Sequence, residues 1–297
     1  MILLWGLLED GTMRSVHDRL VAMNADVYFV NHAEIDRSAI EFISSPQPSY
    51  CLSYRGNQTD FSEFRSAYLR PYNFRDYPQF GDEEESSDRA RSADLFHHLI
   101  HSWAEHTDAR IINKPSAEAT NHSKLFQSIY ISESGFLIPD SLISNDAEEI
   151  LAFSKAHTSI IYKSMSSIRS IVKEFSPGDL VGHEEMGPVF FQRRIIGKNI
   201  RVHVVGEEVF ACEIESEGID YRYAKSRMTP IELPEDIASA STGLAKRLGL
   251  LVAGIDLIVT PEGQWYCLEA NPSPGFSYYD IFPERSIAQA VAEALYI

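Results

Sequence analysis

Cysteine and long apolar runs are both scarce in this chain of 297 residues. Its three cysteines, Cys51, Cys212 and Cys267, form no CxxC pair, which argues against a disulfide framework and against the usual zinc and dithiol motifs. No stretch approaches the roughly 20 apolar residues of a membrane-spanning helix. The apolar start meets Glu9 and Asp10 without a basic residue, unlike a secretory signal. We therefore expect reduced, dispensable thiols in a cytoplasmic protein with no membrane partner.

Positive charge is also in short supply. The chain has 26 lysines and arginines against 43 aspartates and glutamates, which gives a formal net charge of −17. Proteins that coat nucleic acid or anionic membranes need a basic surface, so we expect no nucleic-acid partner. A local basic pocket for phosphate groups is compatible with this balance.

Familiar glycine-rich and nucleophile motifs are missing as well. The first apolar segment is followed by WGLLEDG rather than GxGxxG, and Gly197-Lys198 lacks the earlier glycine and the Ser or Thr of a P-loop. Ser170 and Lys173 have SxxK spacing without a KTG or SDN element, and no GxSxG is present. These absences argue against a dinucleotide-binding fold, a P-loop NTPase and a serine hydrolase.

Strand and helix patterns alternate along the chain, which is typical of an α/β protein. We expect a first α/β domain with strands at residues 1–6, 26–31 and 108–113 and helices at 12–23 and 89–105. The rest predicts helices at 123–132, 146–156, 234–249 and 286–295, and strands at 159–163, 169–174, 189–196, 200–205, 208–214, 251–259 and 265–270. The strand pairs within 159–174 and 251–270 are predicted hairpins, so α+β lobes follow the first domain.

Four histidines, His97, His98, His101 and His106, lie close together in the second predicted helix. His97 and His101 are spaced i, i+4, so both could face one metal ion, with Glu105 one turn further on. No HExxH motif is present, however. We therefore expect these histidines to occupy a polar, solvent-facing side of the helix.

Residues 254–275, GIDLIVTPEGQWYCLEANPSPG, combine apolar strands with oxygen ligands. A carboxylate such as Asp256 inside an apolar strand is costly unless it is paired or bound to a metal. In a hairpin Asp256 lies opposite the end of the second strand, where Glu269 and Asn271 share one face through their i, i+2 spacing. Three oxygen ligands on one face suit a hard cation such as Mg²⁺. A structural aspartate beside a polar loop is an equally weighted alternative.

Cationic side chains lie on other predicted strands and helices, namely Lys124, Lys163, Arg194, Arg201 and Arg222. Single lysines are mostly surface residues. A nucleoside triphosphate with Mg²⁺, however, needs several cations and several carboxylates that converge on one cleft. The chain contains both the cationic side chains and the carboxylates that such a site requires.

Four segments together resemble the ATP-grasp superfamily of carboxylate–amine ligases. Asn121-His-Ser-Lys124-Leu125 and Tyr162-Lys163 are similar to the segments that carry the family's two ATP lysines. Residues 190–202, FFQRRIIGKNIRV, resemble its hinge strand and phosphate-binding arginine, and Gly254-Ile-Asp256 with Leu268-Glu269-Ala-Asn271-Pro resembles its paired Mg²⁺ ligands. Residues 210–214, 220–222 and 233–234 are similar to the branch with microviridin-type peptide cyclases and ribosomal-protein glutamate ligases.

The resemblance implies an ATP-grasp fold in three parts. These are an N-terminal α/β pre-ATP-grasp domain over residues 1–112, a first lobe with the lysines and a phosphate loop over 113–185, and a C-terminal lobe with the metal site over 186–297. It also implies a ligase that uses ATP to convert a carboxylate into an acyl phosphate. An amine or hydroxyl then displaces the phosphate to give an amide or ester, and a peptide is a candidate substrate.

The same resemblance implies roles for individual residues. Asp256, Glu269 and Asn271 would hold one or two Mg²⁺ ions, with Mn²⁺ as a substitute. Arg201 would act on the transferred phosphoryl group and Arg222 on a substrate carboxylate. ATP would be bound by Lys124, Lys163, Ser167, Gln192, Arg193, Ile195 and Glu213, of which Glu213 is also a candidate general base.

The chain departs from the family pattern at three places. Ser164-Met-Ser-Ser167 replaces a glycine-rich loop, Arg193 stands where a glutamate is usual, and Asn199 where an aspartate is frequent. The missing glycine favours one alternative, a nucleotide-binding protein without ligase activity, and a kinase or phosphohydrolase is another. ADP release that depends on a carboxylate substrate distinguishes them. A homodimer is compatible with the sequence.

Overall fold

The computed structural model describes residues 1–44, 49–73, 87–163, 173–180, 187–216 and 226–297. The chain divides into two compact units, each assembled from segments that are distant in the sequence. Unit 1 comprises Met1–Glu118, Gly249–Val252 and Ser273–Ile297, and unit 2 comprises Ala119–Leu248 and Ala253–Pro272. The predicted division at residues 112 and 185 stays a prediction. Within the described ranges, no helix is long and apolar enough to cross a membrane.

Unit 1 contains a parallel sheet of four strands in the order β2-β1-β6-β7. Its strands are β1 (Ile2–Gly6), β2 (Val27–Asn31), β6 (Ser66–Leu69) and β7 (Arg110–Ile112), and its helices are α1 (Gly11–Ala22), α2 (Asp88–His106), α3 (Pro115–Glu118) and α7 (Ile287–Leu295). The predicted α/β start is therefore confirmed. A second, antiparallel sheet of β3 (Ala39–Ile43), β4 (Ser49–Tyr54) and β5 (Asn57–Asp60) was not predicted.

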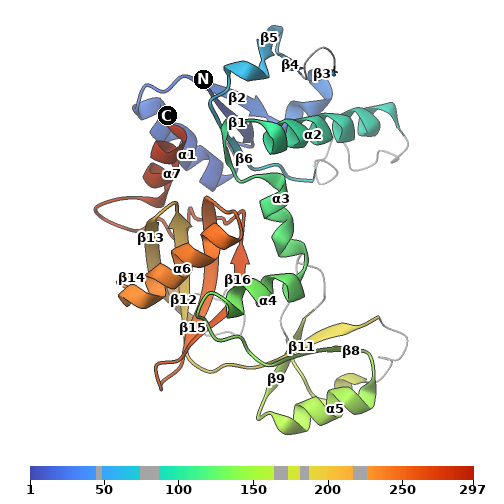
Figure 1. Cartoon of the computed structure of the whole chain (residues 1–297), viewed down its shortest axis with the longest axis vertical. Helices are drawn as coiled ribbons and strands as arrows, with labels where there is room; N and C mark the ends of the chain where they lie inside the picture. Colours follow the sequence, from blue (N-terminus) through green and yellow to red (C-terminus); the bar gives the residue numbers. More distant parts are fainter. Residues whose placement is uncertain (45–48, 74–86, 164–172, 181–186, 217–225) are drawn as a thin grey trace. The chain divides into compact units, whose positions relative to one another are not determined.

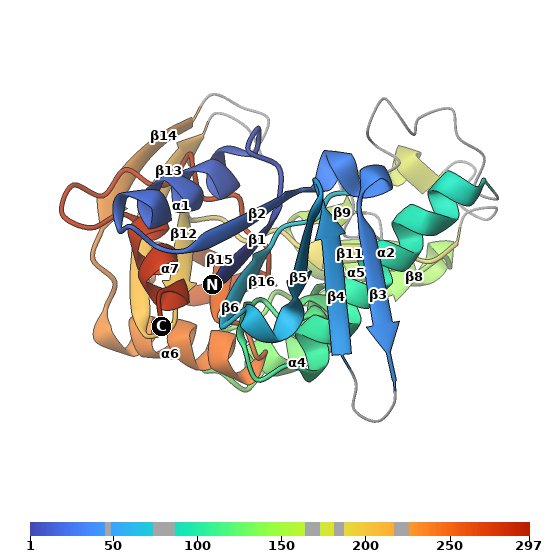
Figure 2. The same cartoon turned by 90° about the horizontal axis from the view of Figure 1, so that it is seen from above.

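The parallel sheet is covered on both faces, as strands that are apolar along their whole length require. Helices α1 and α7 lie on one side of it and α2 lies on the other (Figure 2). Every residue of β1 is buried. Leu3 and Trp5 of this strand belong to one core cluster with Phe96 and Ile100 of α2.

Two of the four predicted histidines, His97 and His101, contradict the prediction of a polar helix face, whereas His98 and His106 are exposed as expected. His97 and His101 pack edge-on against Trp5, with ring centroids 5.1 and 5.9 Å away, and His32 does so at 5.0 Å. The buried stripe of α2 passes through Phe96 and Ile100, so His97 and His101 beside it are half-buried against the core. Among the described residues, no group of three or more His, Cys, Asp or Glu side chains is placed to hold a metal ion.

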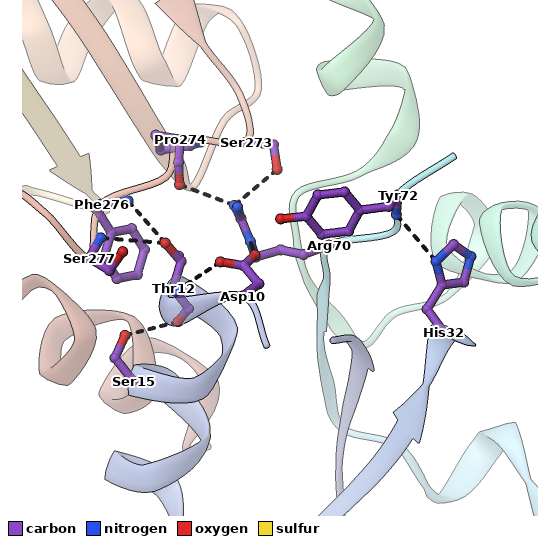
Figure 3. Close-up of polar contacts among 10 residues, drawn as sticks. All are labelled: Asp10, Thr12, Ser15, His32, Arg70, Tyr72, Ser273, Pro274, Phe276 and Ser277. Atoms are coloured by element: carbon purple, nitrogen blue, oxygen red, sulfur yellow. Dashed lines mark hydrogen bonds and ion pairs between the residues drawn. The ribbon is translucent and has the colours of Figure 1, made fainter. Parts of the chain in front are cut away.

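A polar network in unit 1 joins the start of α1 to the segment 273–277 (Figure 3). Arg70 is largely buried, and its Nε donates to Asp10 Oδ2 at 2.8 Å while its Nη1 donates to Ser273 Oγ and the Pro274 carbonyl, each at 3.1 Å. Asp10 also caps α1 by accepting from the backbone N–H of Thr12. Burial opposes ionisation of Asp10, but the charge and hydrogen bond of Arg70 outweigh it and lower the pKa of this carboxyl. Both buried charges are therefore paired.

Unit 2 is built on two sheets (Figure 1). The smaller one has the order β10-β9-β11-β8 and consists of β8 (Ser141–Ser144), β9 (Ile160–Lys163), β10 (Lys173–Glu174) and β11 (Val189–Arg193). The larger one has the order β14-β13-β12-β15-β16 and consists of β12 (Lys198–Val205), β13 (Glu208–Ser216), β14 (Ser226–Ile231), β15 (Val252–Val259) and β16 (Trp265–Asn271). The helices are α4 (Lys124–Ser132), α5 (Ala147–Ala156) and α6 (Glu235–Arg247).

The helices of unit 2 cover both sheets. Helix α5 buries Ile150 against Ile160 and Phe191 of the smaller sheet. Helix α6 packs on β12 and β13, and α4 packs on β16 and on α6. Helix α6 begins one residue later than predicted, because Pro234 is its N-cap rather than part of its first turn.

Both predicted hairpins are confirmed. Strand β9 pairs with β10, and β15 pairs with β16, in each case antiparallel. Residues 169–172 of the predicted strand lie outside the described residues. The short strands β6, β8 and β14 were not predicted, because four to six residues carry too little periodicity to be recognised.

His32, which is buried, and His97, which is half-buried, predict acid sensitivity of unit 1. Burial, with a smaller contribution from neighbouring histidine charges, lowers the pKa of His32 to about 4 and that of His97 to about 3. Unfolded histidine titrates near 6.5. Below that pH the unfolded chain binds protons that the folded chain does not, so stability is highest above about pH 6.5 and falls as the pH drops towards 4.

Replacement of one histidine should weaken this dependence. Between pH 7.5 and 5, His97→Phe should lose about 1–2 kcal/mol less unfolding free energy than the wild type, which urea denaturation at both pH values measures. His98→Gln, at an exposed position of the same helix, is the control and should keep the wild-type dependence. If His97→Phe keeps the wild-type pH dependence of unfolding, the lowered pKa of His97 is not a source of the acid sensitivity.

Candidate active site

Charged residues from separate strands meet on one face of the larger sheet. Arg201 lies on β12 and Asp256 on the neighbouring strand β15. The Nη1 of Arg201 donates to Oδ1 of Asp256 at 2.7 Å, and the two side chains are only 6% and 16% exposed. A buried ion pair of this kind is costly to break from either side, because the remaining charge would be left without compensation. The pair therefore fixes both groups.

Glu269 reaches the same face because β16 contains one extra residue. Leu257 pairs with Cys267, but the next residue of β15, Asp256, pairs with Glu269. Leu268 is therefore a β-bulge. In a regular ladder Glu269 would lie opposite Ile255, on the other face of the sheet, since side chains alternate along a strand.

The bulge brings the three predicted oxygen ligands to one side. Asp256 lies opposite Glu269, as predicted, and Asn271 lies opposite Gly254, two positions further along β16. Two carboxylates and an amide oxygen are donors that Mg²⁺ accepts. These residues fit a hard divalent cation in both chemistry and placement.

His203 belongs to this group, and sequence reasoning missed it. It is fully buried on β12, two residues after Arg201, and its Nε2 accepts a long hydrogen bond of 3.4 Å from Arg201 Nε. Burial and then the Arg201 charge lower the pKa of His203 well below its usual value. The ring is therefore neutral, with its proton on Nδ1. The i, i+2 spacing of Arg201 and His203 was the available signal.

The predicted hinge residues lie where β11 ends. Gln192 is buried, and its Nε2 donates to Ser141 Oγ at 3.2 Å. Arg193 donates to the Tyr266 hydroxyl at 3.0 Å and pairs with Asp140 at 3.1 Å. Ile195 follows, half-buried, in the short connection to β12. This connection links the smaller sheet of unit 2 to the larger one.

Glu213 lies on β13, opposite Ile200 of β12. It accepts a hydrogen bond from Lys198 Nζ at 3.1 Å. Arg201 lies opposite Cys212, so the alternation of side chains places Glu213 on the other face of the sheet from the Arg201–Asp256 pair.

The two predicted lysines lie on different elements of unit 2. Lys124 is the first residue of α4, and the hydroxyl of the N-cap residue Ser123 accepts from the Phe126 N–H at 3.2 Å. The start of a helix carries partial positive charge, so Lys124 and the helix end both favour an anion. Lys163 ends β9, where it pairs with Phe190, and its side chain is outside the described part of the structure. Ser167 and Arg222 lie outside the described residues altogether.

Comparisons with known proteins find relatives by structure. The search finds no family model that matches the chain and no curated protein that matches it. The macrocyclase MdnC from Microcystis aeruginosa MRC, bound with precursor peptide MdnA, has a TM-score of 0.85 and 23% identity over 100% of this chain and 99% of that one. A RiPP-associated ATP-grasp ligase from Chryseobacterium gregarium, in complex with ADP and a leader and core peptide, has a TM-score of 0.84 and 21% identity over 99% and 96%.

A more distant likeness points the same way. The D-alanine–D-alanine ligase from Bacillus anthracis, complexed with ATP, has a TM-score of 0.62 and 14% identity over 100% of this chain and 96% of that one. These likenesses show that the chain has the ATP-grasp fold, which confirms the predicted fold. They include the first third of the chain, where the sequence offered only an α/β start.

The site also predicts how the thiols react. Cys212 and Cys267 are buried, and burial raises the pKa of Cys212 to about 11 and that of Cys267 well above its usual value. Both are therefore protonated and shielded at neutral pH, whereas Cys51 is half-buried. A bulky disulfide reagent should label Cys51 alone in the native protein and all three thiols after denaturation, as read by mass spectrometry. Rapid native labelling of Cys212 or Cys267 would contradict the burial of these two thiols.

Proposed function

We propose that this chain is an ATP-dependent ligase that joins a carboxylate to an amine or hydroxyl through an acyl phosphate, with a peptide among its substrates. One observation carries the proposal: Asp256 faces Glu269 and bonds Arg201 on a single sheet face of an ATP-grasp fold. The matched structures are ligases and macrocyclases crystallised with ATP, ADP or precursor peptides, which supports both kinds of ligand.

The charged face supplies the reacting centre. Asp256, Glu269 and Asn271 would hold Mg²⁺, which when bound neutralises charge on the β- and γ-phosphates. Arg201 holds Asp256 in place and brings a guanidinium to the position where the transferred phosphoryl group carries its charge. His203 stays neutral and orients Arg201 from the side away from Asp256 without adding a second cation.

The nucleotide would lie between the two sheets of unit 2. Lys124, at the start of α4, and Lys163, at the end of β9, would bind its phosphates. The segment of Gln192, Arg193 and Ile195, which links the sheets, would contact the base. Glu213, which the register places on the other face of the larger sheet from Arg201, stays a nucleotide ligand on the sequence resemblance alone. Ser167 for a phosphate and Arg222 for a substrate carboxylate are proposed on the sequence resemblance alone. We place the reaction in the cytoplasm, where ATP is supplied.

The test is ADP formation over a set of peptides and amino acids, followed by the mass of the product. Ligation predicts that ADP release rises only when a carboxylate and an acceptor are both present, and that the product has the combined mass of the two less one water. ADP release with water as the sole acceptor would indicate a phosphohydrolase. A stable phosphorylated product would indicate a kinase, and either result would contradict ligation.

Glu269→Gln should separate turnover from folding and nucleotide binding. Glutamine keeps the size and one acceptor oxygen but removes the charge that positions the cation. We expect turnover to fall by about 10²-fold or more, the effect of losing one electrostatic stabiliser, while ATP affinity falls modestly and the melting temperature is equal or higher. ADP release, ATP titration and thermal melting measure the three quantities.

The control for this substitution is Glu262→Gln. Glu262 lies exposed in the turn between β15 and β16, so the same chemical change there should leave turnover within about twofold. Normal turnover in Glu269→Gln would exclude Glu269 from the site, and the proposed cation site would then be wrong.

A further inference from the structure

We propose that Gln127 is a positioning residue, which fixes Glu269 and Asn271 by holding the backbone of the residue between them. The inference rests on the proposed function, because it gives Gln127 a task at the cation site of that ligase. Gln127 is not proposed to contact the side-chain oxygens of Glu269 or Asn271 that would bind the cation. It acts through Ala270.

The contact is a two-point clamp. Gln127 lies on α4 and is 3% exposed. Its Nε2 donates to the Ala270 carbonyl at 2.7 Å, and its Oε1 accepts from the Ala270 N–H at 3.0 Å. One primary amide thus satisfies both backbone groups of a single residue, as a neighbouring strand would.

The clamp lies on the open edge of the sheet. Strand β16 is the last strand in the order of the larger sheet, so its outer backbone groups need other partners. At the start of β16 the backbone of Leu137 provides them, by donating to the Trp265 carbonyl and accepting from the Cys267 N–H. At Ala270 the partner on this edge is the side chain of Gln127. The edge is held on both sides of Glu269.

The bulge makes this clamp necessary for register. A slip by one residue would bring Leu268 opposite Asp256 and would turn Glu269 to the other face of the sheet. Leu268 is apolar, so it forms no charge interaction that would favour the observed register over the slipped one. The clamp resists it, because Gln127 can bond both groups of Ala270 only in the observed register.

The helix that carries the clamp also carries a proposed phosphate ligand. Lys124 and Gln127 are three residues apart on α4, so they are neighbours on its surface. The helix therefore holds the phosphate lysine and the cation-binding strand in one rigid piece. A shift of Ala270 would displace the cation relative to the phosphates. We therefore expect the cation to contribute less to nucleotide binding.

The experiment compares Gln127→Met with Ile131→Ala. Methionine keeps the volume but removes both hydrogen bonds, whereas Ile131 is buried on the same helix and its truncation lowers stability by packing alone. ADP affinity is measured by calorimetry with and without Mg²⁺, and amide hydrogen exchange is followed at residues 268–271.

The expected result is a specific loss of coupling to the metal. In Gln127→Met, the factor by which Mg²⁺ strengthens ADP binding should fall by about 10-fold or more, the usual effect of losing a residue that supports metal ligands. ADP affinity without Mg²⁺ should stay within about threefold, and the Ala270 amide should exchange faster. Ile131→Ala should keep the wild-type coupling despite its lower melting temperature. If Gln127→Met does not fold, Gln127→Asn, which keeps the amide but is one methylene shorter and cannot hold both groups of Ala270 in the same geometry, should show an intermediate loss.

Two outcomes would overturn the inference and are distinguishable. Unchanged Mg²⁺ coupling in Gln127→Met, or an equal loss in Ile131→Ala, would reduce Gln127 to a packing residue and leave the ligase proposal standing. Wild-type protein that binds ADP with no effect of Mg²⁺, or that binds no ADP, would remove the proposed function and this inference together.

Discussion

The extra residue Leu268 in β16 sets the geometry on which the candidate site depends. Side chains alternate along a strand, so one added residue exchanges the two faces for everything beyond it. Without the bulge, Glu269 would lie opposite Ile255, and Asp256 with Arg201 would face the apolar Leu268. A bulge also interrupts the ladder and leaves backbone groups to be satisfied elsewhere. Leu137 and Gln127 bond backbone groups on the outer edge of the same strand, one on each side of the bulge.

Buried side chains bond the residues that precede and follow this hairpin in the sequence. In unit 1, Asn113 donates to the Val252 carbonyl at 2.7 Å and accepts from the N–H groups of Leu251 and Val252. Arg70 holds Ser273 and Pro274, the residues that follow the hairpin (Figure 3). A buried polar group is costly unless it is fully bonded, and then it specifies one arrangement. The residues that border the hairpin in the sequence are thus bonded within unit 1, and Gln127 bonds the Glu269–Asn271 portion within unit 2.

The hairpin and its facing carboxylates could be predicted, whereas the contacts that fix them could not. The apolar run around Asp256 and the spacing of Glu269 and Asn271 are local patterns, and they predicted the right strands. The bulge at Leu268 depends on the register in which two strands pair, and no residue type in the segment WYCLEAN predicts it. In the sequence Gln127 looks like an ordinary helix residue. Its proposed positioning role depends on Ala270, which lies 143 positions away.

In unit 1, too, local patterns could be predicted from the sequence and long-range contacts could not. The first parallel strands were recognisable from continuous apolar runs, but the sheet of β3, β4 and β5 was not, because β3 is short and mostly exposed and so lacks the continuous apolar run of a buried strand. His97 and His101 look like polar surface residues in a helix pattern. They are half-buried because Trp5, remote in sequence, supplies an aromatic surface for their rings. Arg70 and Asp10 pair across 60 positions, which periodicity cannot detect.

Oxygen transfer from substrate to phosphate tests acyl phosphate formation most directly. A peptide that stimulates ADP formation would be labelled with oxygen-18 in its carboxylates and incubated with the protein, ATP, Mg²⁺ and the acceptor. A carboxylate oxygen that attacks the γ-phosphate becomes the bridging oxygen and leaves with phosphate when the acceptor attacks carbon. We therefore expect one labelled oxygen in each phosphate released. Phosphate that carries no label while product forms would contradict an acyl phosphate, and with it the ligase chemistry assigned to Asp256, Glu269 and Arg201.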